Sequence, residues 1–211
     1  ARLLRTVIRA CRAATAPDFP IGVKLNSSDF QQGGFSEEEC VQVVRWLGEE
    51  GVDLLELSGG SYEQPSMMGV KSKAQAAAPV AESTRRREAY FLEYARTIRA
   101  VATMPVMVTG GFRSRAAMDE ALAAGELDMI GLGRPMCVDT DLPRRLFSGE
   151  WASAQSYETG IVPPKAGLAW FCLQLLRIGD GIEPDRALDG ARAMELYASS
   201  EAAAARALQG R

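Results

Sequence analysis

The sequence contains no histidine, and this absence excludes more chemistry than any other feature of its composition. Without histidine, the usual zinc sites and every Ser-His or Cys-His nucleophile are ruled out. Four cysteines are present, and none has Cys-x-x-Cys spacing: Cys11, Cys40, Cys137 and Cys172. We therefore expect no metal site, and we expect the cysteines to be buried free thiols.

The sequence also lacks a strong charge of either sign and any long apolar run. Its net charge is −3, so electrostatics give no reason to expect a nucleic acid or a membrane as partner. No uninterrupted apolar stretch approaches the roughly 18 residues of a membrane span, and the N-terminus does not resemble a signal peptide. These absences predict a soluble, cytoplasmic protein.

What the sequence does contain is a regular alternation of strand and helix patterns. Short apolar runs typical of buried strands lie at residues 21–25, 52–57, 106–109 and 127–132. Helical patterns follow them. Ser36 and Glu39 form a capping box before one helix, and Ser114 caps another. This alternation predicts a parallel α/β architecture in which both faces of the sheet are covered.

Further helices are expected at both ends of the chain. An amphipathic helix opens the sequence, with apolar residues at helical spacing at Leu4, Val7, Ile8 and Cys11. Residues 88–102 also have helical periodicity. Towards the C-terminus, an apolar helix at 165–178 precedes an Ala-rich helix at 184–208.

These patterns divide the chain into two expected domains. Residues 1–150 contain the alternating elements, and residues 151–211 form a helical extension that packs on the exterior of the first domain. The aromatic and aliphatic residues of the apolar helix are expected in the core rather than at a cofactor: Trp170, Phe171, Leu175 and Leu176.

Two strand ends carry glycines in a pattern that suggests a phosphate site. Gly110, Gly111 and Phe112 follow one strand, and Gly133 and Arg134 follow the next. In (β/α)8 barrels the loops after the last two strands often bind phosphate, because glycines let backbone N–H groups approach the oxygens. A charge-assisted hydrogen bond from the arginine is worth about 1.5–3 kcal/mol. Alternatively, the glycines only form tight turns.

The same strand ends resemble a known family. The runs PVMVTGGF at 105–112 and LDMIGLGRPMCVDTDLPRRL at 127–146 resemble strands seven and eight of the old yellow enzyme, or NADH:flavin oxidoreductase, family. FPIGVKLN at 19–26 resembles strand five, and GVDLLELSGGSYE at 51–63 resembles strand six. The resemblance implies the second half, about strands 5–8, of a (β/α)8 TIM barrel, followed by C-terminal helices.

The resemblance also implies which residues bind a cofactor. The phosphate of FMN would be held by Gly110, Gly111 and Phe112, together with Gly133 and Arg134. Lys24 would lie at the N1 and C2 edge of the flavin ring, where a cation stabilises the reduced form. A preference of about 2 kcal/mol raises a two-electron potential by about 40 mV. Alternatively, Lys24 extends into solvent from a strand end.

The implied reaction is the reduction of FMN by NADH or NADPH, followed by hydride transfer to a small activated alkene such as an enone or a dienoyl thioester. No catalytic residue is assigned in this chain, because the family builds its substrate site in the first half of the barrel. Four strands cannot close an eight-stranded barrel. The partner is therefore expected to be an N-terminal barrel half or a second copy of the chain, and the isolated chain is expected to be inactive.

The sequence leaves alternatives open for three features: the function of the chain, the role of Glu56 and the polar segment at residues 61–87. The chain is alternatively another phosphate-binding barrel enzyme, or a non-catalytic half-barrel that acts in assembly. Glu56 and Ser58 form an acid–base pair, or else Glu56 pairs with a neighbour from another strand. The polar segment at residues 61–87, with Tyr62, Met67 and Met68, lies where substrate approaches, or it is a surface loop.

Overall fold

The computed structural model describes residues 1–26, 34–58 and 95–209. Within these ranges the chain forms two compact units, Ala1–Leu132 and Gly133–Arg211, and each is described by itself. The polar segment with Tyr62, Met67 and Met68 lies outside the described residues. The division of the chain at residue 150 stays a prediction.

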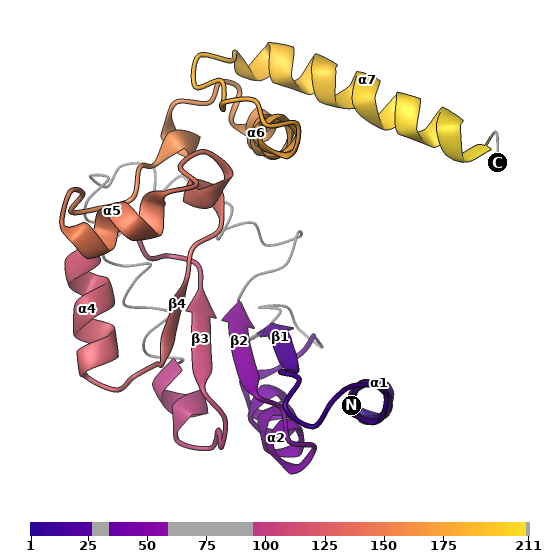
Figure 1. Cartoon of the computed structure of the whole chain (residues 1–211), viewed down its shortest axis with the longest axis vertical. Coiled ribbons are helices and arrows are strands. Elements are labelled where there is room, and N and C mark those ends of the chain that lie inside the picture. Colours follow the sequence, from indigo (N-terminus) through magenta and orange to yellow (C-terminus); the bar gives the residue numbers. More distant parts are fainter. Residues whose placement is uncertain (27–33, 59–94, 210–211) are drawn as a thin grey trace. The chain divides into compact units, whose positions relative to one another are not determined.

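The first unit is built on a sheet of four parallel strands in the order β1-β2-β3-β4 (Figure 1). The strands are β1 (Gly22–Asn26), β2 (Leu54–Ser58), β3 (Val106–Thr109) and β4 (Met129–Gly131). Because neighbours in the sequence are also neighbours in the sheet, each connection is a crossover of the kind that joins parallel strands. The four predicted strands are confirmed, and β1 and β4 are the edges of the described sheet.

Helices in this unit begin where the sequence predicts. In α2 (Glu37–Glu49), the Glu39 amide donates to the Ser36 hydroxyl at 3.2 Å, and the Ser36 amide donates to the Glu39 carboxylate at 2.9 Å. In α4 (Arg115–Ala123), the Ser114 hydroxyl accepts from the Ala117 amide. Of the helix predicted at 88–102, the described part is helical over residues 95–99.

One face of the sheet is buried, and the other is partly exposed. Leu55, Leu57, Val106 and Val108 are at most 2% exposed. They share the core of this unit with apolar side chains from the helices, namely Cys40, Val44, Leu47, Ile98, Met118 and Ala121. Residues that alternate with them, from Lys24 to Met129, are half-buried or exposed. Among the described residues, helices supply the apolar cover for one face, and coverage of the second face stays a prediction.

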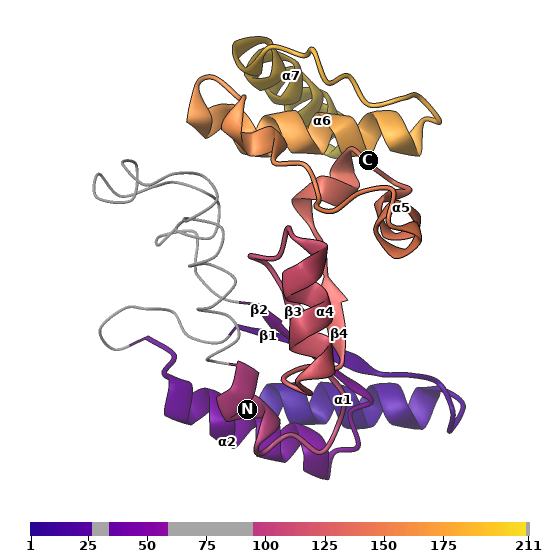
Figure 2. The same ribbon diagram turned by 90° about the vertical axis from the view of Figure 1, so that its left-hand side faces the viewer.

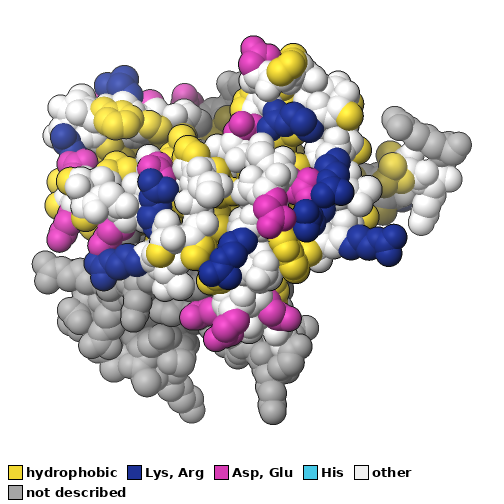
Figure 3. Space-filling model, turned by 90° about the horizontal axis from the view of Figure 1, so that it is seen from below, with side chains coloured by type: hydrophobic (Ala, Val, Ile, Leu, Met, Phe, Trp, Pro, Cys, Tyr) yellow, Lys and Arg dark blue, Asp and Glu magenta, His cyan; other side chains and the backbone are white. Residues whose placement is uncertain are grey.

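Helix α1 (Arg2–Ala14) is held mainly by ion pairs. Arg5 and Arg9 each donate to the carboxylate of Glu50 at 2.6 Å, and Arg12 donates to Asp53 at 2.6 Å. Among its apolar residues only Ile8 is buried. Charges of both signs are interspersed over most of the face drawn in Figure 3.

The second unit is helical and ends in two long helices (Figure 2). Its elements are η2 (Arg134–Cys137), α5 (Leu142–Ser148), η3 (Tyr157–Thr159), η4 (Pro164–Ala166), α6 (Gly167–Gly179) and α7 (Gly190–Gln209). Both predicted C-terminal helices are confirmed, although α7 begins later than residue 184. The buried Gln174 side chain hydrogen-bonds both the amide and the carbonyl of Asp185, at 2.7 and 3.0 Å, and this holds the intervening segment outside the helix.

The core of this unit lies between α6, α7 and η4. Trp170 and Phe171 are 3% and 7% exposed, which confirms their prediction as core residues. Leu175 and Leu176 are each 50% exposed, so their prediction as core is wrong. Helix α6 buries one face only, and Leu175 and Leu176 lie outside it. The buried residues of that face are Ala169, Trp170, Phe171 and Gln174.

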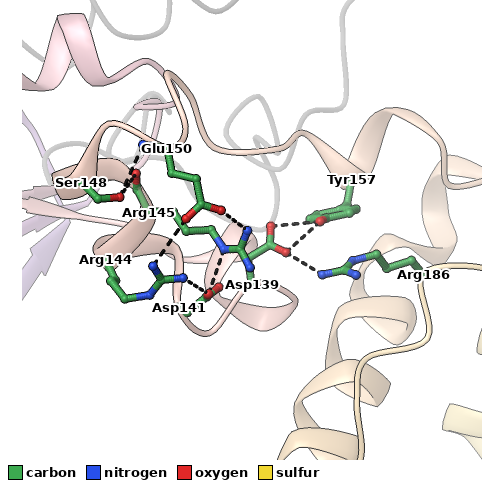
Figure 4. A network of polar contacts seen from close by, with 8 residues as sticks. All are labelled: Asp139, Asp141, Arg144, Arg145, Ser148, Glu150, Tyr157 and Arg186. Carbon is green, nitrogen blue, oxygen red and sulfur yellow. Dashed lines mark hydrogen bonds and ion pairs between the residues drawn. The ribbon is translucent and has the colours of Figure 1, made fainter.

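A buried carboxylate ties three segments of the second unit together (Figure 4). The Asp139 side chain is 1% exposed, and it accepts hydrogen bonds from the Tyr157 hydroxyl and from Arg186, all at 2.9 Å. The Tyr157 ring stacks on Trp170, with centroids 6.1 Å apart. Burial, followed by the interaction with Asp139, raises the pKa of Tyr157 above its ordinary value. A buried charge needs such partners, so Asp139 fixes how the segments around it pack.

The four cysteines are free, but only Cys40 is buried. Cys11 is exposed because α1 buries little of its surface, and Cys137 and Cys172 are half-buried. The prediction of buried thiols is therefore right for one position and wrong for Cys11.

Acid should weaken the attachment of α1. Hydrogen bonds from Arg9 and Arg5 lower the pKa of Glu50 from 4.5 to about 2. A depressed folded-state pKa adds stability above the unfolded value, and that stability is lost as the pH falls towards the folded value. We expect the urea midpoint, followed by circular dichroism, to fall less between pH 5 and pH 2 in Glu50→Gln than in the wild type. The control is Glu49→Gln, whose side chain is 58% exposed. Equal losses in all three proteins would contradict the prediction.

Candidate functional site

Lys24 and Glu56 form an ion pair on the open face of the sheet. They lie opposite each other in the parallel register of β1 and β2. The ammonium group of Lys24 donates to the Glu56 carboxylate. The side chains are 54% and 21% exposed, so the carboxylate is the more buried partner. Of the two interpretations left open for Glu56, the structure shows the pairing with a residue from another strand.

Glu56 is ionised at neutral pH. Partial burial acts to raise its pKa, but the hydrogen bond from Lys24 and the neighbouring Thr109 hydroxyl outweigh burial, so the pKa lies below its ordinary value. An efficient general acid or base has a pKa near the working pH. The environment of Glu56 therefore suits a fixed negative charge better than proton transfer.

A single row of side chains runs across the sheet from this pair. Glu56 lies beside Met107, and Met107 lies beside Met129, in the registers of the neighbouring strands. Thr109 lies two residues further towards the carboxyl end and therefore on the same face. The open face thus has a charged half on β1 and β2 and an apolar half on β3 and β4.

The predicted glycine turn follows β3 directly. Gly110 and Gly111 have φ values of 124° and 79°, a region that residues with side chains rarely adopt. The Phe112 amide donates to the Gly110 carbonyl at 3.0 Å, and the Phe112 ring is fully buried. The turn is therefore anchored by Phe112, whose amide is already bonded within it, and it leads directly to Ser114, the cap of α4.

Gly131, the last residue of β4, and Gly133, just after it, differ in what requires them. A Cβ atom on Gly131 would lie 1.9 Å from the Thr109 hydroxyl oxygen and 2.8 Å from its Cβ atom. Gly133 has a φ of −92°, and a Cβ atom there would meet nothing within 4 Å. Close approach of β3 and β4 therefore requires Gly131, whereas no contact among the described residues requires Gly133.

Arg134 lies in the second unit beside a carboxylate. Its guanidinium is 3.6 Å from Glu158, and the two side chains are 28% and 14% exposed. This arrangement holds the arginine in a defined place. The assignment of Gly133 and Arg134 to a phosphate stays a prediction.

Arg113 is a candidate that the sequence patterns missed. It follows the glycine turn, is only 7% exposed, and donates to the Phe112 carbonyl at 2.8 Å. A buried cation next to a glycine turn adds positive charge where an anion would bind. The available signal was an arginine placed between an apolar anchor and a helix cap.

Residues 1–26, 34–58 and 95–209 contain no group of three or more His, Cys, Asp or Glu side chains suited to a metal ion. In the same ranges no helix has the length and apolar composition needed to cross a membrane.

Comparison with known proteins identifies the family. Residues 1–151 match the NADH:flavin oxidoreductase / NADH oxidase family, so the chain belongs to this family. The resemblance seen in the strand-end motifs is confirmed. The chain is 37% identical over 145 residues to the NADH-dependent flavin oxidoreductase iliE of Neonectria sp. (strain DH2). The aligned region covers 68% of this chain and 19% of that protein.

Solved structures show the same fold. A 2-naphthoyl-CoA reductase in complex with 2-naphthoyl-CoA aligns with a TM-score of 0.61 and 21% identity, over 74% of this chain and 23% of that one. The old yellow enzyme homologue from Zymomonas mobilis aligns with a TM-score of 0.50 and 21% identity, over 75% and 39%. The chain therefore spans well under half of each relative and has part of the TIM-barrel fold, with four parallel strands.

Gly131 and Gly133 should respond differently to substitution. Gly131→Ala forces a methyl group into the Thr109 side chain, and overpacking of this kind costs about 1–3 kcal/mol. Gly133→Ala should lower the free energy of unfolding by less than Gly131→Ala does, because its methyl group meets no atom of another strand or helix within 4 Å. Urea unfolding of both variants measures the difference. Equal destabilisation would show that the close approach at Gly131 has been misjudged.

Proposed function

We propose that this chain supplies strands five to eight of a (β/α)8 barrel and the flavin-phosphate half of an FMN site. The whole protein is an NAD(P)H-dependent oxidoreductase of the ene-reductase type. One observation carries the proposal: Lys24 lies in a parallel sheet, and the Gly110–Gly111 turn follows the carboxyl end of a strand of the same sheet. The chain that carries this arrangement belongs to the NADH:flavin oxidoreductase family. In TIM barrels the carboxyl end of the strands carries the active site.

The residues present fit the phosphate group of FMN. The positive φ angles of Gly110 and Gly111 create a turn without side chains, which a phosphate can approach closely. Arg113 adds a buried cation directly after the turn. Gly133 has unfilled space around it, and the close approach of a ligand would explain a glycine that packing does not require. We assign the phosphate to these residues and to Arg134, with Phe112 holding the shape of the turn through its buried ring and its bonded amide.

The residues on the open face fit the flavin ring. Lys24 lies on the same face as Thr109, and the glycine turn starts at the residue after Thr109. We place Lys24 at the N1 and C2 edge of the ring, where its charge acts on the electrons that reduction adds. FMN, when bound, would carry hydride from NADH or NADPH to an activated alkene. The chain's own residues bind it and set its electrostatic environment.

The names of two relatives support the proposed reductant and substrate class. The flavin oxidoreductase iliE is named as NADH-dependent, and the reductase of highest structural similarity cited above was solved with a thioester of coenzyme A. The first name supports a reductant of the nicotinamide type, and the second supports an unsaturated acyl thioester, alongside an enone, as the proposed substrate class. No residue of this chain is assigned a catalytic role in the reduction.

The described sheet has two edges, at β1 and β4, and its open face is only partly covered. Such edges tend to pair with further strands. We propose that an N-terminal barrel half or a second copy of the chain completes the barrel, and that residues 151–211 pack on its exterior. The substrate site is incomplete without these further strands, so the 211-residue chain alone reduces little or no alkene.

The first test is flavin retention by the purified chain. After incubation with FMN and gel filtration, we expect the flavin absorption band to travel with the protein, while cyclohexenone and NADPH give little or no turnover.

Gly133→Ala should weaken FMN binding about tenfold, the effect of losing about 1.4 kcal/mol. Gly167→Ala is the matched control, because its Cβ atom also meets nothing within 4 Å.

A wild-type chain that stays colourless after incubation with FMN and forms a discrete dimer would support the assembly role in place of the flavin site. Rapid turnover by the isolated chain would contradict the need for a partner.

A second test addresses Lys24. Replacing it with methionine removes a positive charge from the proposed ring edge, so the midpoint potential of bound FMN should fall by about 40 mV. A redox titration against a dye of known potential measures the shift. No shift would favour a phosphate-binding barrel enzyme in which Lys24 has no contact with a flavin.

A further inference from the structure

Lys24 does not act as a lone cation on the open face. We propose that Glu56 is a second residue of the flavin site, which positions the Lys24 ammonium and sets how much of its charge acts on the ring. The inference rests on the proposed function, because it concerns the electrostatics of the same site. In the proposed function, Lys24 acts as a single positive charge at the ring edge. In this inference, Lys24 and Glu56 act there together as a pair without net charge.

The geometry gives Glu56 the fixed role in this pair. A lysine ammonium ends a flexible four-carbon side chain, and the Lys24 side chain is 54% exposed. The Glu56 side chain is 21% exposed and arises from a central strand of the sheet. The direct contact between them therefore restrains the lysine from the side of the carboxylate.

The carboxylate is itself supported from the next strand. Thr109 acts with Lys24 to lower the pKa of Glu56. The Thr109 side chain is in turn packed against Gly131, where a Cβ atom would lie only 1.9 Å from its hydroxyl oxygen. One row of neighbouring residues on this face therefore crosses all four strands, from Gly131 through Thr109 and Glu56 to Lys24.

The electrostatic consequence has a definite sign. A single positive charge at the ring edge favours reduced FMN, which carries more negative charge. A carboxylate in contact with that charge leaves a dipole, whose field falls off faster with distance than that of a lone charge. Glu56 therefore limits the stabilisation of reduced FMN and keeps the potential below the value that Lys24 alone would produce.

The experiment is a redox titration of bound FMN in four forms of the chain: the wild type, Lys24→Met, Glu56→Gln and the double variant. The glutamine keeps the size of the side chain and an oxygen that accepts from Lys24, but it removes the charge. Glu56→Gln should favour the reduced flavin about tenfold more than the wild type, a rise of about 30 mV for a two-electron couple. Lys24→Met should shift the equilibrium in the opposite direction. The double variant is neutral again, so its potential should move most of the way back to the wild-type value.

Two control variants accompany the series. Glu126→Gln removes a carboxylate that is 13% exposed and paired with Arg96, from the segment before β4. That segment lies at the opposite end of the strands from the glycine turn, so the potential should not change. Glu56→Asp keeps the charge and should leave the potential near the wild-type value. Urea midpoints of all forms show whether each variant folds.

The outcomes distinguish a failure of the proposed FMN site from a failure of the role of Glu56 alone. If the wild-type chain retains no FMN, the proposed function is overturned, and this inference with it. If FMN binds but Glu56→Gln has the wild-type potential and the double variant matches Lys24→Met, only the inference is overturned. A role of Glu56 confined to joining β1 and β2 would move the urea midpoint without raising the potential.

Discussion

Parallel pairing of β1 with β2 places Lys24 beside Glu56, and the electrostatics of the candidate site depend on this one contact. Each residue on its own has an ordinary interpretation, a lysine reaching solvent or a glutamate available for proton transfer. Side by side, they are a charge-compensated pair on the open face of the sheet. Their partial exposure lets the pair act on a ligand, while the contact with Lys24 helps to lower the pKa of Glu56.

Glycine has two different uses at the strand ends. At Gly131 it allows Thr109 of the neighbouring strand to come close, so it belongs to the packing of the sheet. At Gly110 and Gly111 it permits positive φ angles, which shape the turn before α4. Gly133 has neither a close neighbour across the sheet nor a positive φ angle among the described residues. The space beside it is compatible with the phosphate that we propose for this site.

Charged contacts also hold the periphery of both units. The ion pairs of Arg5 and Arg9 with Glu50 attach α1, which buries little apolar surface. In the second unit, Asp139 joins Tyr157 and Arg186 beside a small aromatic core. Both arrangements depend on a carboxylate whose side chain is at most 6% exposed. Such groups are sensitive to the loss of a partner, because an unpaired buried charge is strongly destabilising.

Local patterns in the sequence determined the strands, the capped helices and the membership of the flavin oxidoreductase family. Ser36 with Glu39 predicts its helix start because a capping box involves neighbours in the chain. Tertiary structure decided what depends on residues distant in sequence. Lys24 and Glu56 are 32 residues apart, so their pairing follows from strand register. The exposure of Leu175 and the burial of Arg113 were likewise decided by packing, because hydrophobicity alone does not show which face of an element another segment covers.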